Sequence, residues 1–126
     1  MRKFNTTSPK VEKLLQDLLC SCDHESYRHT FYSIGVELAS ILNERIVDAE
    51  SVALACASED ADWLAKGIVD NFRSSLDLCV YWSKRHNLGL DSENNLLEFA
   101  AIEKSYEEIH QNVDTLIITK SIISSS

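Results

Sequence analysis

Glycine and proline are scarce in this sequence, which has three glycines and one proline among its 126 residues. An all-β protein with many tight turns needs more of both, so their scarcity favours a helix-rich or α/β chain. Long apolar runs are also missing, since no stretch approaches the roughly 20 apolar residues that span a bilayer. The start of the chain lacks the apolar region of a secretory signal. We therefore expect a cytoplasmic protein that does not enter a membrane.

Basic residues are outnumbered as well, with 12 Lys and Arg against 20 Asp and Glu, for a formal net charge of −8. A nucleic-acid surface normally needs a basic stripe, so we expect no nucleic-acid partner. The four cysteines are Cys20, Cys22, Cys56 and Cys79. In the reducing compartment expected here, a disulfide framework is not predicted.

Residues 8–45 have the apolar spacing of helices. Ser8 caps a predicted helix over Pro9–Cys20, and the proline suits its first turn. Apolar residues continue at helical spacing over about Glu25–Glu44, which predicts a second helix. Gly35 lowers the helix propensity of that segment and indicates a close contact with another helix. The sequence therefore predicts a helical N-terminal region.

Residues 50–126 have a different pattern, in which strands alternate with helical segments. The predicted elements are a strand over Val52–Ala57, a helix opened by Ser58-Glu59-Asp60, a strand over Leu76–Trp82, a loop over Leu88–Asn95, a short strand over Leu96–Ile102, a helical turn over Tyr106–Gln111 and a last strand around Leu116–Ile118. Such alternation implies right-handed crossovers and a mostly parallel sheet. We expect one α/β domain over residues 1–126, whose last strand lies at an edge or is followed by further chain.

Small polar residues follow the last strand, where a doubly wound sheet binds its ligands. Their backbone amides and hydroxyls suit a phosphate group, and a lysine adds a positive charge. Two more basic residues follow the second strand and are expected at the same edge of the sheet. The predicted ligand-binding residues are Thr119, Lys120, Ser121, Ser124, Ser125, Lys84 and Arg85.

Three acidic residues, Glu59, Asp60 and Asp62, stand at the start of the third predicted helix. Carboxylate oxygens are the ligands that hard cations prefer, so these residues are candidates for a magnesium site. Acidic residues also stabilise the first turn of a helix through its dipole, and this is the commoner reason for such a cluster. The sequence leaves both explanations open.

The order of elements from Ile34 to the end of the chain resembles the type I phosphoribosyltransferase fold. Ser51–Asp62 stands where that family has its pyrophosphate turn, and Asp114–Ser126 stands where it has its ribose-phosphate loop. Thr119 and Lys120 replace the two acidic residues that hold the ribose hydroxyls in the family. The resemblance implies a domain that binds a phosphorylated ribose or nucleotide-type ligand and has degenerate catalytic motifs. It also implies that the chain ends before the family fold is complete.

Any catalysis that the resemblance implies is phosphoribosyl transfer, with a magnesium ion to carry the charge of the diphosphate. A competing hypothesis is a non-catalytic protein-interaction or dimerisation module. In that case the helices over about Pro9–Glu44 pack on a partner protein or on a second copy in a homodimer.

Overall fold

Two capped helices begin the part of the chain that the structure, a computed structural model, describes, residues 8–110 and 112–122. Helix α1 (Pro9–Cys20) starts after Ser8, whose hydroxyl accepts a hydrogen bond from the backbone N–H of Val11. Helix α2 (His24–Arg45) starts after Asp23, whose carboxylate accepts from Ser26 N at 2.8 Å. Both caps satisfy backbone donors that a helix start leaves unpaired. The predicted helical N-terminal region is confirmed.

Four strands form one sheet: β1 (Val52–Ala57), β2 (Leu76–Leu90), β3 (Leu96–Glu108) and β4 (Thr115–Thr119). Their order is β3-β2-β1-β4, with β1 parallel to both β2 and β4 and with β3 antiparallel to β2. The α/β class is confirmed. The prediction of a mostly parallel sheet is wrong, because the sheet is mixed.

The β2–β3 hairpin causes that difference. The predicted loop Leu88–Asn95 is confirmed only for residues 91–95, because β2 continues to Leu90. The turn is closed by Asp91, whose Oδ1 accepts from Asn95 N at 2.8 Å. The predicted helical turn Tyr106–Gln111 is also wrong, since β3 continues to Glu108. Strands that form a two-stranded ribbon have solvent on both faces, so they lack the apolar alternation by which a sheet strand is recognised.

The third helical segment is divided into α3 (Ser58–Asp60), a π-helical turn η1 (Ala61–Ala65) and α4 (Lys66–Asn71). Its apolar residues pack with α2 and with one face of β1, and the core includes Ala39, Leu54 and Ile68, which are almost fully buried. The close contact predicted at Gly35 is confirmed, since α2 touches α4 there. No helix in residues 8–110 and 112–122 is apolar over a length that could cross a membrane.

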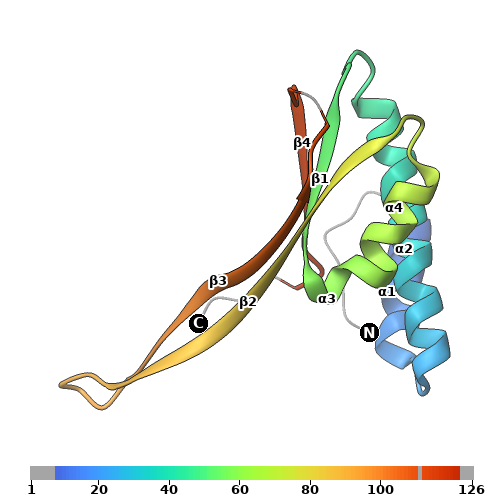
Figure 1. Cartoon of the computed structure of the whole chain (residues 1–126). Helices are drawn as coiled ribbons and strands as arrows, with labels where there is room; N and C mark the ends of the chain where they lie inside the picture. Colours follow the sequence, from blue (N-terminus) through green and yellow to red (C-terminus); the bar gives the residue numbers. More distant parts are fainter. Residues whose placement is uncertain (1–7, 111, 123–126) are drawn as a thin grey trace.

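All the helices lie on one side of the sheet, and no helix or strand in residues 8–110 and 112–122 covers the other side (Figure 1). Pairing with β1 ends at Tyr81, and beyond it β2 pairs only with β3. This part of the hairpin, residues 83–103, projects away from the body in Figure 1 and is called the arm below. The fold therefore has two unusual surfaces, an uncovered sheet face and a free two-stranded arm.

Candidate functional site

The carboxyl ends of β1 and β4 bring together two of the predicted clusters. The strands are adjacent and parallel, with Cys56 opposite Thr119, so the turn after β1 lies beside the segment after β4. The Lys120 ammonium forms an ion pair with Glu59 and lies 3.5 Å from Oδ2 of Asp60. The backbone N–H of Ser121 donates to the same Asp60 oxygen at 3.0 Å. Lys120, predicted to bind a phosphate, and the acidic residues Glu59 and Asp60, predicted to bind a metal ion, therefore bind each other.

This pairing settles the charge at the site. The hydrogen bond from Lys120 lowers the pKa of Glu59, and the same bond raises the pKa of Lys120, so both groups are charged at neutral pH. The ammonium occupies the place between Glu59 and Asp60 that a divalent cation would need. Asp62 is exposed on the next turn. Among the described residues, no three His, Cys, Asp or Glu side chains are placed to hold a metal ion together.

Ser121 lies beside Lys120 on Asp60, but the two basic residues predicted to join them are on another element. Thr119 is buried. Lys84 and Arg85 belong to β2 rather than to a loop after it, where they pair with Ala101 and Ala100 of β3. As consecutive strand residues they point to opposite faces, and Arg85 forms an ion pair with Glu98 at 3.2 Å. Placing these two residues in a strand-end loop was wrong. Ser124 and Ser125 lie outside the described residues.

A groove of about 480 Å³ runs across the uncovered sheet face. Its apolar walls come from all four strands, and Lys120 lies at its margin. Ile118 is 76% exposed, Ile102 64% and Leu116 58%. We call this surface the open sheet face; it consists of Ala55, Ala57, Tyr81, Ser83, Ile102, Leu116 and Ile118.

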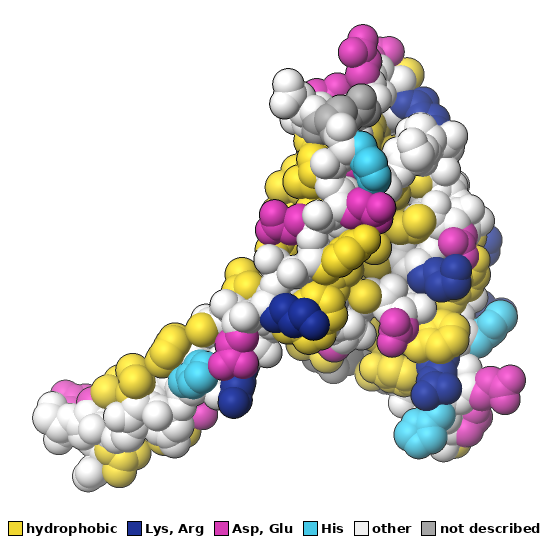
Figure 2. Space-filling view, in the orientation of Figure 1, with side chains coloured by type: hydrophobic (Ala, Val, Ile, Leu, Met, Phe, Trp, Pro, Cys, Tyr) yellow, Lys and Arg dark blue, Asp and Glu magenta, His cyan; other side chains and the backbone are white. Residues whose placement is uncertain are grey.

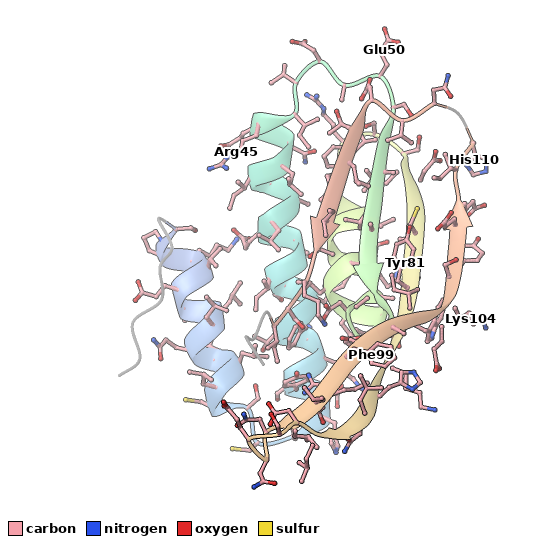
Figure 3. All side chains as sticks on the ribbon, turned by 90° about the vertical axis from the view of Figure 1, so that its left-hand side faces the viewer. Arg45, Glu50, Tyr81, Phe99, Lys104 and His110 are labelled. Atoms are coloured by element: carbon pink, nitrogen blue, oxygen red, sulfur yellow. The ribbon has the colours of Figure 1, made fainter. Side chains whose placement is uncertain are left out.

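The open sheet face continues onto the arm, where more large apolar side chains are exposed. Figure 3 looks onto this side of the sheet, with Tyr81 on β2 and Phe99 on the β3 strand of the arm. Figure 2 shows hydrophobic side chains along the arm and on the neighbouring part of the body. The exposed apolar residues of the arm are Leu88, Leu90, Leu96, Leu97, Phe99 and Ile102.

Sequence reasoning missed the open sheet face because Leu116–Ile118 reads as a continuous apolar run, the pattern of a strand buried on both faces. Only Ile117 is buried against the helices, and Leu116 and Ile118 point the other way. The spacing of so short an apolar run gives no signal that one of its faces is exposed.

A second hollow, of about 540 Å³, lies between α2 and the η1–α4 segment. Three of its charged side chains have contacts within the hollow. Lys66 pairs with Asp70 at 2.9 Å, and the guanidinium of Arg28 lies 5.7 Å from the centre of the Trp63 ring. Tyr32 donates to Asp70 at 3.1 Å. These contacts hold α2 against α4 and define no ligand class.

Acid–base chemistry at the open sheet face is limited. Burial raises the pKa of the Cys56 thiol to about 11, and the hydrogen bond to Glu107 raises the pKa of Tyr81 to about 12. Neither group is ionised at neutral pH, so neither is an activated nucleophile. The surface offers apolar contact rather than reactive groups. Comparison with protein-family models, with curated proteins and with solved structures found no match for this chain.

Proposed function

We propose that this chain is a non-catalytic protein-interaction module that binds another polypeptide through the open sheet face and the arm. The observation that carries the proposal is the exposure of Leu116 and Ile118 on a sheet whose other face is packed with helices. Parallel strands are normally covered on both faces. A polypeptide bound to the open sheet face would supply the missing cover.

The area involved is that of a protein interface. Eight large apolar residues are each more than 40% exposed: Leu88, Leu90, Leu96, Leu97, Phe99, Ile102, Leu116 and Ile118. On the arm they are divided between its two faces, because consecutive strand residues such as Leu96 and Leu97 point to opposite sides. At about 200 Å² for a fully exposed residue of this size, the eight present on the order of 900 Å² of surface. A standard interface takes about 800 Å² from each partner, so a polypeptide that contacts the open sheet face and both faces of the arm would cover an area of that order.

A polypeptide fits this surface better than a small molecule or a nucleic acid does. The groove is open and has few polar groups that converge on one point, whereas a small-molecule site encloses most of its ligand. The net charge of −8 opposes nucleic acid. The arm extends the surface beyond the body, as an interface with a large partner requires.

The proposed interaction surface is not on the helices over Pro9–Glu44, where the sequence predicted it. Helix α2 packs on α4 and contributes to the core, and α1 packs on α2. Lys10 of α1 also forms an ion pair with Glu37 of α2. Much of the apolar surface of α1 and α2, which was predicted to bind a partner, is therefore packed within the chain.

Photo-cross-linking in cells tests the proposal. A photoreactive amino acid at Ile102 or Ile118 should give discrete adducts with another polypeptide chain. The matched control is Leu19 on α1, which is also an exposed apolar residue, at 55%, but lies outside both surfaces. Equal labelling from all three positions, or none from Ile102 and Ile118, would contradict the proposal.

A second candidate function is the binding of a phosphorylated ribose or nucleotide-type ligand by a phosphoribosyltransferase-like fold. It is supported by the position of Lys120 and Ser121 beside the turn after β1, at the carboxyl ends of two adjacent parallel strands. The carboxyl ends of strands are where open α/β sheets bind ligands. A phosphate there would have to replace Glu59 as the partner of Lys120, and a magnesium ion would have to replace Lys120 between the carboxylates.

Calorimetric titration with phosphoribosyl diphosphate and magnesium tests this second candidate. Binding should produce heat that Lys120→Ala removes and that Lys10→Ala, a lysine on α1, leaves unchanged. No heat at millimolar ligand, or the same heat from the Lys120→Ala variant, would exclude it.

A further inference from the structure

Strand β4 forms one edge of the sheet, and within the described residues it pairs with no strand except β1. The backbone N–H of Thr115 donates to Ser51 O at 3.2 Å, on the side of β1. Because backbone groups alternate in direction along a strand, Leu116 and Ile118 direct their N–H and C=O groups to the free edge. Unpaired edge groups of this kind are a template for another strand.

The residues of β4 do nothing to block such pairing. Natural edge strands are commonly protected by charged side chains, by proline or by bulges. The sequence of β4, T-L-I-I-T, contains no charge and no proline, and its pairing with β1 is regular. The opposite edge, β3, is protected, since it carries four glutamates and its pairing with β2 is interrupted twice.

We propose that the partner of β4 is β4 of a second copy of this chain, paired antiparallel about a two-fold axis at Ile117. This inference rests on the proposed function and names the partner at one end of the open sheet face. The two sheets would join into one, with both helical layers on the same side, because the axis is perpendicular to the sheet. The open sheet faces of the two copies would then be continuous.

The register of this pairing is self-complementary. With Ile117 on the axis, Leu116 of each copy stands opposite Ile118 of the second copy, and Thr115 stands opposite Thr119. Leu116 and Ile118 are the residues with outward backbone groups, so they form the hydrogen-bonded pairs. Their side chains meet on the open sheet face, where cross-strand apolar pairs stabilise a sheet.

The sequence of β4 favours a second copy over an unrelated strand, because T-L-I-I-T has the same pattern of polar and apolar residues in both directions. The charged residues just beyond the hydrogen-bonded pairs already have partners within their own chain. Asp114 accepts backbone hydrogen bonds from Glu50 and Ser51, at 2.9 and 3.3 Å, and Lys120 pairs with Glu59 and Asp60. Two copies of a chain with a net charge of −8 repel each other in general, so the attraction at this edge comes from the backbone hydrogen bonds and from the apolar contacts of Leu116 and Ile118.

Neighbouring registers lose this match. Centring the axis on Leu116 would place Asp114 opposite Ile118, and centring it on Ile118 would place Lys120 opposite Leu116. A centre between two residues would oppose side chains from different faces of the sheet, which antiparallel pairing does not allow. Ile117 is therefore the centre at which apolar residues stand opposite apolar residues and the two threonines stand opposite each other.

Sedimentation equilibrium over a range of concentrations tests the proposal on the full chain. The expected result is a monomer–dimer equilibrium. Leu116→Pro removes an N–H that points to the free edge and leaves the bonds to β1 in place, as proline at an edge permits. It removes two hydrogen bonds per dimer and should raise the dissociation constant about 30-fold. Leu116→Thr, which keeps the N–H, should weaken the dimer less than the proline variant does.

A distance measurement keeps the test valid if the proline variant does not fold. In a Cys20→Ser, Cys22→Ser background, a nitroxide on Ile118→Cys should show strong dipolar broadening, because Cα atoms of diagonal neighbours are about 7–8 Å apart. The same label on Leu19→Cys should show none. Broadening at both positions or at neither would overturn the proposed register.

Failure of this inference can be told apart from failure of the proposed function. A chain that stays monomeric at all concentrations, yet forms cross-links from Ile118 to a different protein, would overturn the second copy and leave the interaction module standing. A monomeric chain without cross-links from Ile102 or Ile118 would overturn both. An adduct of two copies from Ile118 supports the inference.

Discussion

Gly35 and Gly67 lie against each other where α2 crosses α4, so closely that a Cβ atom on Gly67 would stand 3.0 Å from the Cα atom of Gly35. The same Cβ would stand 2.3 Å from the carbonyl oxygen of Tyr32. A Cβ on Gly35 would meet the carbonyl oxygen of Leu64, also at 2.3 Å. The two helices therefore touch through their backbones, and this contact sets how the helical layer lies on the sheet.

Gly35→Ala should destabilise the protein, although alanine has the higher helix propensity by about 1 kcal/mol. The obstructing atoms belong to backbone and cannot rotate away, so the helices must separate. Overpacking of this kind costs typically about 1–3 kcal/mol, and we expect the upper part of that range. Urea denaturation measures the loss. Ser40→Ala, at an exposed position of α2, is the control and should change stability by less than about 0.5 kcal/mol.

The helical half of the fold was predictable because its signals are local. A capping serine and a first-turn proline define the start of α1, and Gly35 indicated the close contact that the structure contains. The β2–β3 hairpin was not predictable in the same way. Residues 83–87 are polar because both faces of the arm are exposed to solvent. A polar segment without apolar alternation is predicted to be a loop.

Only part of the candidate site was predictable from the sequence as well. That Lys120 and the acidic turn lie near one another follows from the adjacency of β1 and β4, and alternation of strands and helices predicts parallel strands but not which of them are neighbours. That the two groups pair depends on side-chain geometry across 61 positions of sequence, between Lys120 and Glu59. The open sheet face depends on the lack of a second helical layer among the described residues, which spacing within a short apolar run does not reveal.

The four cysteines should fall into two reactivity classes. Cys20 and Cys22 are exposed, and Cys56 and Cys79 are buried free thiols. Burial raises the pKa of Cys56 to about 11 and also raises the pKa of Cys79. Titration with a thiol reagent at neutral pH should therefore modify two thiols quickly and the other two only after denaturation. Fast modification of all four in the native protein would contradict the core assignment.

Asp60 and Asp62 should differ in their contribution to stability, although both are first-turn acids. The Asp60 carboxylate is buried and accepts the Ser121 N–H at 3.0 Å. Asp60→Ala leaves that N–H without its acceptor and removes a partner of Lys120, so it should cost about 1–3 kcal/mol. Asp62→Ala, at an exposed position, is the matched control and should change stability by less than about 0.5 kcal/mol. Equal losses in urea denaturation would show that the carboxylates act only through the helix dipole.

The pair of His110 and Asp77 should make stability depend on pH above the unfolded pKa of histidine, about 6.5. Nδ1 of the His110 ring lies 2.8 Å from Oδ1 of Asp77, and the backbone N–H of His110 donates to Oδ2 of Asp77 at 3.0 Å. The hydrogen bond with Asp77 raises the pKa of His110, so the stabilisation is complete below the unfolded value of about 6.5 and is lost as the pH rises through the folded value. The same pair lowers the pKa of Asp77, so its contribution is lost in acid.

The melting temperature of the wild type should therefore exceed that of His110→Gln by most at about pH 5.5, and by less at about pH 8.5. Because His110 is exposed, the change should be small, and it should shrink further in high salt. A difference between wild type and His110→Gln that stays constant from about pH 5.5 to 8.5 would mean that the neutral imidazole serves Asp77 as well as the charged one does.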